Sequence, residues 1–249
     1  MTFKTLTFFI LFLSVAFQAQ ATLSVSKYRL YFDKDNRTDS LQIRNTGSVL
    51  MDYSVELSLV AMTEDGTLYK VEEDPLSAIP LLRYSPRRGT VEAGGRQALR
   101  FALRKPAGLA DGEYRALLTI SSTADTKSTA TVSLNTTLNY NIPIIVRHGR
   151  VEATTELLEP RLVMRSDIPH LEFWQSRQGN RSLYGNFIVS DEQGNELGAL
   201  NNSAVYLPLK RRKVSIELNK RVKGKVSVEY EEIAQFGGEL TATTEIELK

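Results

Sequence analysis

Cysteine is absent from this 249-residue chain, and histidine occurs only twice. Without thiolates the protein can form no disulfide, no cysteine-based zinc site and no cysteine nucleophile. The two histidines, His148 and His170, fall in different predicted segments and have no carboxylates around them at the spacing of a metal site. We therefore expect no metal ion and a fold that is stabilised by burial alone.

The motifs of the common enzyme classes are also missing. The sequence holds no G-x-S-x-G, no P-loop, no H-E-x-x-H and no G-x-G-x-x-G. A glycosidase that uses a pair of catalytic carboxylates has no such motif, so the missing motifs do not exclude this class. However, aromatic residues make up only 8% of the chain and Trp174 is its one tryptophan, which is a poor basis for a sugar-stacking cleft. We predict a protein without catalytic residues and without a cofactor.

The chain also lacks an excess of charge, because 31 basic side chains face 29 acidic ones. This near balance argues against a general nucleic-acid binder. One local bias exists between Leu209 and Lys225, where eight residues are basic and one is acidic. This basic stretch is either the solvated face of a hairpin or a docking patch for an acidic partner, and the sequence leaves both interpretations open.

Long apolar runs are absent except at the N-terminus. Residues 6–17 form an almost unbroken apolar run, which follows Lys4 and precedes the small residues Ala19 and Ala21. This pattern predicts a cleaved secretory signal peptide over residues 1–21, and the run is too short for a membrane span. We therefore expect an exported protein that is not inserted in the membrane.

Short segments of alternating polar and apolar residues, separated by turns at Gly, Asn and Asp, fill the rest of the chain. Strands at this spacing are typical of all-β sandwiches. A boundary is expected at residues 148–152. It divides the sequence into an N-terminal domain over 22–148 and a smaller C-terminal β-sandwich domain over 149–249.

One local motif favours an immunoglobulin-like form of the first sandwich. Asp111-Gly112-Glu113-Tyr114 opens a strand, and Ala116 stands where an immunoglobulin domain has its second cysteine. In those domains a tyrosine two residues before that cysteine holds a corner, because its hydroxyl bonds to upstream backbone. We expect Tyr114 to do the same; the alternative is an ordinary junction of turn and strand.

The segment from Thr131 to Arg147 is an unusually long candidate strand. With the exception of Thr136, every second residue is apolar or aromatic, namely Val132, Leu134, Leu138, Tyr140, Ile142, Ile144 and Val146. Because a strand has a period of two, one face should be apolar and the other wet. The segment is roughly three times as long as an ordinary strand of about five or six residues.

These features together resemble the periplasmic chaperones of the chaperone–usher pilus pathway. The stretches that carry the resemblance are LSVSKYRLYFD, GTVEAGGRQALRFAL, LADGEYRALLTI and TVSLNTTLNYNIPIIVR, which cover most of residues 22–147. The second domain matches that family only in size, position and β character. The resemblance implies two immunoglobulin-like β-sandwich domains in an L-shaped arrangement and a location in the periplasm.

The resemblance also implies a function, which is to bind pilus subunits by donor-strand complementation and to deliver them to an outer-membrane usher. It marks Val132, Leu134, Thr136, Leu138 and Tyr140 as the donor residues. A free strand edge also allows a self-capping homodimer. The alternative is a structural or adhesive two-domain protein of the periplasm or cell surface, which would use the long strand internally.

In the chaperones that this chain resembles, two basic residues clamp the C-terminal carboxylate of the subunit. Arg29 matches the arginine, and a guanidinium suits this role because it forks onto a carboxylate and keeps its charge. The usual lysine is missing, since Pro143 stands at its position. We expect Arg115 or Arg147 to supply the second charge.

Overall fold

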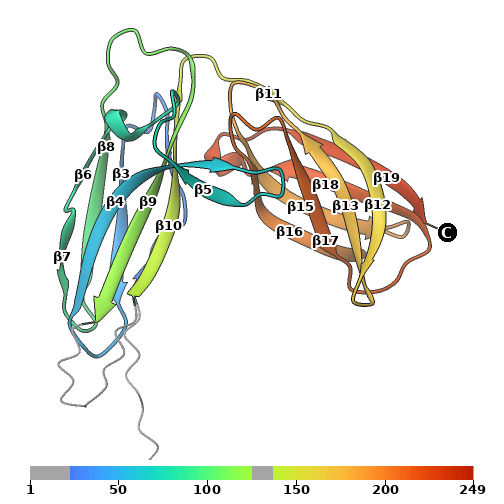
Figure 1. Cartoon of the computed structure of the whole chain (residues 1–249), viewed down its shortest axis with the longest axis horizontal. Coiled ribbons are helices and arrows are strands. Elements are labelled where there is room, and N and C mark those ends of the chain that lie inside the picture. The colour runs from blue at the N-terminus through green and yellow to red at the C-terminus, as the bar shows by residue number, and fades with distance from the viewer. Residues whose placement is uncertain (1–22, 125–136, 249) are drawn as a thin grey trace, which may run out of the picture.

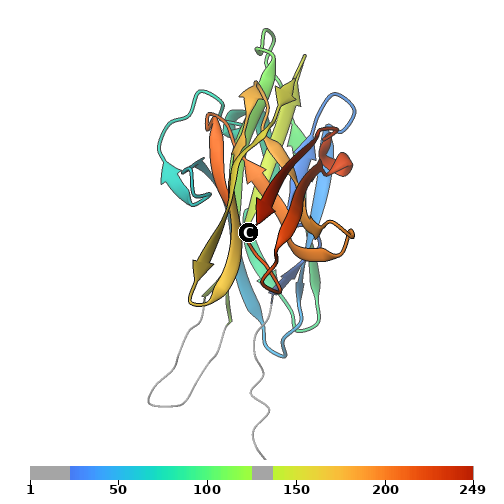
Figure 2. The same cartoon turned by 90° about the vertical axis from the view of Figure 1, so that its right-hand side faces the viewer.

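The structure is a computed structural model that describes residues 23–124 and 137–248. It contains strands and two 3-10 helices, η1 (Ile79–Leu81) and η2 (Ala234–Phe236). The strands form two β-sandwiches that meet at an angle, so the outline is L-shaped in Figure 1. Figure 2 views the molecule from the side, with the second sandwich in front of the first. The prediction of an all-β protein with two sandwiches in this arrangement is confirmed. Within the described residues, no helix is long and apolar enough to span a membrane.

The first sandwich is built from two sheets. The first sheet has the order β1-β3-β8-β6, with β1 at Leu23–Val25, β3 at Thr38–Asn45, β8 at Arg96–Leu103 and β6 at Leu82–Ser85. The second has the order β2-β10-β9-β4-β5, with β2 at Leu30–Phe32, β10 at Thr137–His148, β9 at Gly112–Ala124, β4 at Met51–Met62 and β5 at Leu68–Val71. Strand β7 (Arg88–Val91) pairs with β4 as well.

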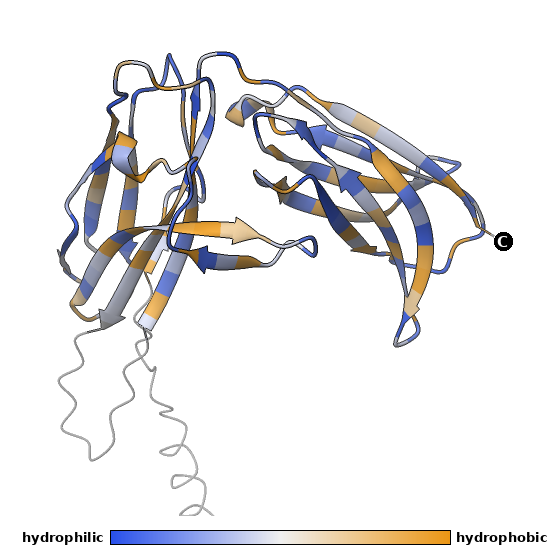
Figure 3. Cartoon of the chain, turned by 45° about the horizontal axis from the view of Figure 1, so that its top comes forward, coloured by the Kyte–Doolittle hydropathy of each residue, from blue (hydrophilic) through white to orange (hydrophobic). Residues whose placement is uncertain are grey.

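Alternation along β10 supplies much of the core between these two sheets. Ile142, Ile144 and Val146 are fully buried there, as the period of two requires. Figure 3 shows the same alternation of apolar and polar residues along other strands. At the start of β9, the Tyr114 hydroxyl donates a 2.9 Å hydrogen bond to the carbonyl of Ala110. This bond confirms the predicted corner tyrosine.

The second sandwich also has two main sheets. One has the order β12-β13-β17, with β12 at Leu157–Arg165, β13 at Ile168–Ser176 and β17 at Arg211–Glu217. The other has the order β16-β15-β18-β19, with β16 at Glu196–Val205, β15 at Leu183–Asp191, β18 at Gly224–Glu232 and β19 at Thr241–Leu248. A short pair joins β11 (Ala153–Thr154) and β14 (Gln178–Gly179). Phe173, Phe187 and Tyr230 fill the core between the main sheets.

The connection between the sandwiches runs from the end of β10 at His148 to the start of β11 at Ala153. Gly149 lies in this connection with a φ of 63°. A Cβ atom at Gly149 would lie 1.6 Å from Asp111 Oδ1, so a side chain is excluded there. The other oxygen of Asp111 accepts a 3.1 Å hydrogen bond from the backbone N–H of Arg150. The connection is therefore held against the first sandwich.

Glu172 on β13 is a buried carboxylate that is surrounded by cations. Its Oε2 lies 2.9 Å from Arg161 Nη2 and 2.9 Å from Lys213 Nζ, and its Oε1 bonds with Arg165. The hydrogen bonds from Lys213 and Arg161 lower the pKa of Glu172 from 4.5 to about 2. This carboxylate therefore links all three strands of its sheet.

We expect Glu172→Gln to lower the free energy of unfolding at pH 7 by roughly 1–2 kcal/mol, because three partly exposed cations lose their partner. A carboxylate with a lowered folded-state pKa stabilises the fold above the unfolded pKa and loses this effect as the pH falls toward about 2. The variant should therefore show a weaker loss of stability between pH 5 and 2 than the parent protein. Urea unfolding across this range measures the difference. The matched control is Glu229→Gln, at an exposed position on β18, and an equal effect of both substitutions would contradict the assignment.

Candidate functional site

The two edges of β10 are used differently. Strand β9 pairs with β10 along all twelve residues, from Thr137 to His148. On the other side, β2 pairs in parallel with Ile144–Val146 alone. Among the described residues, Thr137–Pro143 therefore has no strand partner on that side. An edge of this kind presents unpaired N–H and C=O groups to any strand that can approach it.

The predicted donor residues lie along this free edge or beyond it. Leu138 keeps 37% of its surface exposed. Tyr140 is half-buried against the first core, and its hydroxyl donates to the carbonyl of Leu23. Tyr140 thus contributes to its own domain, whereas Leu138 is accessible. Val132, Leu134 and Thr136 lie outside the described residues, so their donor role stays a prediction.

The opposite face of β10 meets the second sandwich. The sequence pattern places Ile145 on the wet face of the strand, but it is only 3% exposed. It packs with Ala204 and Tyr206 of the second sandwich, beside the half-buried Tyr31 and Tyr184. The expectation of a wet face is therefore wrong at this end of β10, because a domain that lies far along the sequence covers it.

Arg29 precedes β2 and enters a group of aromatic rings from the second sandwich. Its guanidinium carbon lies 3.5 Å from the centre of the Tyr184 ring and 5.6 Å from the centres of Tyr206 and Phe236. Nη2 donates a 2.8 Å hydrogen bond to the Tyr206 hydroxyl, and the buried Nε has no partner among the described residues. Cation–π contacts thus hold a cation that is only 7% exposed.

Arg115 on β9 is turned into the same interface. Its Nη2 donates to the carbonyl of Leu207 and lies 3.5 Å from the carboxylate of Asp74. The guanidinium also lies 5.2 Å from the centre of the Tyr206 ring. Desolvation lowers the pKa of Arg115, against the opposite effects of the Glu113 and Asp74 carboxylates. Arg115 therefore has partners in both sandwiches.

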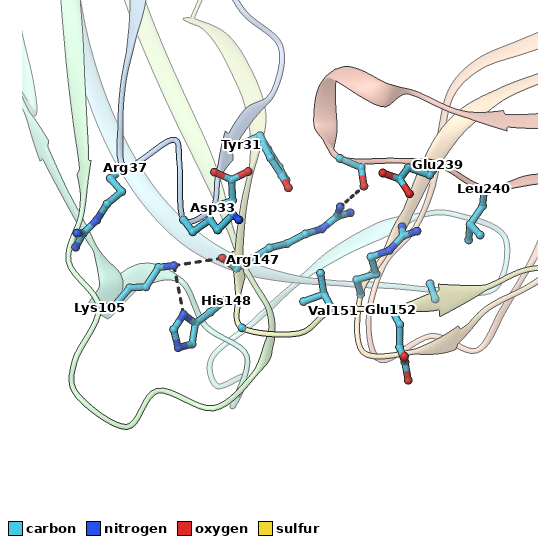
Figure 4. A pocket seen from close by; sticks show the side chains of 15 residues that line it. Tyr31, Asp33, Arg37, Lys105, Arg147, His148, Val151, Glu152, Glu239 and Leu240 are labelled. Carbon is cyan, nitrogen blue, oxygen red and sulfur yellow. Dashed lines mark hydrogen bonds between the residues drawn. The ribbon is translucent and has the colours of Figure 1, made fainter.

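Arg147, near the end of β10, is the most fully bonded of the three predicted anchors. Its Nε lies 3.1 Å from Glu113 Oε2, and its Nη1 donates a 2.7 Å hydrogen bond to the carbonyl of Gly237 in the second sandwich. The Glu113 carboxylate is completely buried. Figure 4 shows Arg147 reaching across from the first sandwich, with Lys105 beside its backbone carbonyl. The hydrogen bond from Arg147 to Gly237 thus joins one sandwich to the other.

The three arginines face different spaces. Arg29 lines a cavity of about 760 Å³, and Arg147 lines the cavity of about 850 Å³ in Figure 4. Arg115 lies in a narrow apolar crevice between Leu59 and Pro143. A clamp on one carboxylate needs its two cations in one place, so the pairing of Arg29 with either of the others stays a prediction.

In residues 23–124 and 137–248, no group of three acidic or histidine side chains could hold a metal ion.

The sequence analysis missed two residues of this interface, Glu113 and Tyr206. Glu113 lies directly opposite Arg147 in the β9–β10 register. Opposite charges at such a cross-strand position attract each other, so an assumed pairing of these two strands could have revealed the pair. Tyr206 carries no comparable signal, because its contacts with Arg29 and Arg115 depend on how the two sandwiches meet.

Comparison with solved structures finds chaperones of pilus assembly. The chain aligns with a chain of the CsuC–CsuE complex, a chaperone and tip adhesion subunit from archaic chaperone–usher Csu pili of Acinetobacter baumannii. The TM-score is 0.53 at 13% identity, with coverage of 89% of this chain and 98% of that one. The YadV chaperone gives a TM-score of 0.52 at 9% identity, with coverage of 90% and 99%. The E. coli chaperone DraB gives 0.51 at 15% identity, with coverage of 92% and 97%.

At these identities the likeness shows the fold, which is the two-domain β-sandwich fold of pilus chaperones. No protein-family model matches the chain, and no curated protein sequence does. The likeness in architecture thus extends over 89–92% of the chain although only 9–15% of the residues are identical.

We expect Arg147→Ala to lower the free energy of unfolding by about 3–5 kcal/mol, because the Glu113 carboxylate stays buried and loses its ion-pair partner. The double variant Arg147→Met with Glu113→Gln should recover much of this loss, since neither side chain of the pair then carries a charge. Urea unfolding measures both. The control is Arg150→Ala, at an arginine whose side chain is 86% exposed. An equal loss of unfolding free energy in the control would show that the buried pair contributes no more to stability than an exposed arginine does.

Proposed function

We propose that this protein is a periplasmic chaperone that binds pilus subunits along β10 and delivers them to an outer-membrane usher. The observation that carries the proposal is the free edge at Thr137–Pro143, which includes the exposed side chain of Leu138. The fold shared with CsuC, YadV and DraB supports it, as does the signal peptide predicted for residues 1–21. The proposed activity needs no catalysis and no cofactor.

Binding in this proposal is the addition of β10 to an unfinished sheet of the subunit. Backbone hydrogen bonds along the free edge would give affinity without demanding a particular sequence. Alternate side chains, with Leu138 followed by Thr136, Leu134 and Val132 toward the N-terminus, would enter the open core of the subunit. Each Val or Leu that becomes fully buried contributes roughly 1.5–3 kcal/mol. The register must be strict, because a slip of one residue turns every apolar side chain to water.

The contacts favour Arg29 as the anchor for the C-terminal carboxylate of the subunit. Its guanidinium has one hydrogen bond among the described residues, to the neutral Tyr206 hydroxyl, and it lines an open cavity. Arg115 and Arg147 already lie near the carboxylates of Asp74 and Glu113. In this proposal they hold the second sandwich in place behind the anchor. A self-capping homodimer, which would use the same edge of β10, also stays a prediction.

We expect Leu138→Asp to abolish subunit capture, because a carboxylate in the subunit core costs about 3 kcal/mol or more and so reduces affinity by at least about a hundredfold. Leu138 is already 37% exposed, so the variant should fold normally. The matched control is Ile188→Asp, at a position on β15 that is 45% exposed. Affinity capture from a periplasmic extract, followed by mass spectrometry, identifies the pilus subunits that each variant retains.

Wild-type yield of subunit with Leu138→Asp would contradict the proposal. So would equal losses with both substitutions, which would indicate a general effect of added charge. If the wild-type protein retains no pilus subunit at all, the structural or adhesive alternative gains support.

A further inference from the structure

Residues 59–71, which we call the strap, form a hairpin that leaves the first sandwich at the edge opposite the free edge of β10. Strand β4 pairs with β9 only as far as Ser58. Beyond that point it pairs with β5, from Leu59 opposite Val71 to Met62 opposite Leu68. Figure 1 shows this hairpin directed toward the second sandwich. The strap therefore extends the sheet into the space between the domains.

The tip of the strap contacts the edge strand β17 of the second sandwich. The backbone carbonyl of Glu64 accepts a 2.6 Å hydrogen bond from the N–H of Lys213. The Glu64 side chain accepts a second bond, at 2.9 Å, from Arg211 Nε. One residue of the tip thus binds through both its main chain and its side chain. At the last strand pair before the tip, Met62 packs with the interdomain cluster around Tyr206.

Gly66 lies at the tip and packs directly against Arg212. Its φ is 91°, and a Cβ atom there would lie 2.5 Å from Arg212 Nε. The Arg212 side chain has little freedom to move aside, because its Nη1 donates hydrogen bonds to Ser203 Oγ at 2.9 Å and to the carbonyl of Ala204 at 3.0 Å. A glycine therefore satisfies two needs at once, the left-handed turn and the close approach to a fixed guanidinium.

These contacts also bear on the basic stretch between Leu209 and Lys225. Arg211 forms its ion pair with Glu64, and Arg212 lies beneath Gly66. The strap tip itself carries two acidic residues, Glu64 and Asp65. Part of this basic stretch thus already has an acidic partner, which is a segment of the same chain.

We propose that the strap is a second interdomain clamp and that Glu64 and Gly66 are positioning residues for the second sandwich. The first clamp, at Arg147 and Gly237, lies at the β10 end of the sheet order, whereas the strap lies at the opposite edge. Two contacts at separated edges restrict both bending and twisting about the connection after His148. Because the strap lies at the edge of the sheet opposite β10, it does not cover the free edge.

The angle between the sandwiches can be measured without any subunit. The chain has no cysteine, so spin labels can be placed through Arg100→Cys on β8 and Glu229→Cys on β18, both exposed positions. We expect a narrow distribution of label distances in the parent protein. The distribution should broaden when Asn-Gly replaces residues 61–69, because this two-residue turn makes the hairpin too short to reach β17. An unchanged distribution in a folded short variant would overturn the proposal.

A charge exchange tests the same contact without shortening the chain. Glu64→Arg places a third cation beside Arg211 and Arg212 and should broaden the distance distribution. Adding Arg211→Glu should restore the narrow distribution, because the ion pair returns with its charges exchanged. Failure of Glu64→Arg to broaden it, or broadening that the second substitution does not reverse, would count against the clamp.

The consequence for subunit capture rests on the proposed function. With Leu138 and Arg29 unchanged, we expect the short variant to capture at least about fivefold less subunit, near the lower end of the usual coupling between distant sites. Undiminished capture would show that the angle does not matter for binding. If the parent protein captures no subunit, the proposed function fails while the distance measurements still decide whether the strap is a clamp.

Discussion

Strand β10 lies in three different environments at once, namely the core of the first sandwich, the junction with the second sandwich and a free sheet edge. The arrangement of the first sandwich and of its junction with the second depends on this constraint. Its even-numbered residues from Ile142 to Val146 fill the core of the first sandwich. Ile145, on the opposite face, is covered by the second sandwich. Toward its N-terminal end, the backbone from Thr137 to Pro143 lacks a neighbour on one side among the described residues. A period of two allows all three uses, because alternate residues face independent environments while the hydrogen-bonding edge stays in the plane of the sheet.

Buried guanidinium groups define the junction between the two sandwiches. Burial of a charge is costly unless partners replace the lost water, and the second sandwich supplies part of these partners to each arginine. Arg29 finds aromatic rings, Arg115 finds Leu207 and Asp74, and Arg147 finds Glu113 and Gly237. Such contacts add less stability than an apolar interface of the same size, but they favour one relative orientation over others.

The strap adds a further contact between the sandwiches, at the edge of the sheet opposite β10. An interface restricted to the connection after His148 would leave the second sandwich free to swing. In the proposed clamp, a hairpin that reaches β17 from the far edge of the sheet restricts this motion through a backbone hydrogen bond, an ion pair, the close approach of Gly66 to Arg212 and the packing of Met62. The protein lacks cysteine, so a disulfide could not have served this purpose.

The sequence by itself determined the class of fold, the alternation of residues along β10 from Thr137 onward and the corner tyrosine Tyr114. These features are local, because periodicity and turn residues act over neighbouring positions of the chain. Only the tertiary structure decided that Ile145 is buried, that Arg29, Arg115 and Arg147 face different cavities, and that Arg211 meets Glu64. Each of these outcomes depends on contacts between residues far apart in the chain. The physical reason is that burial and ion pairing follow from the relative placement of two sandwiches, for which no local pattern in the sequence carries a signal.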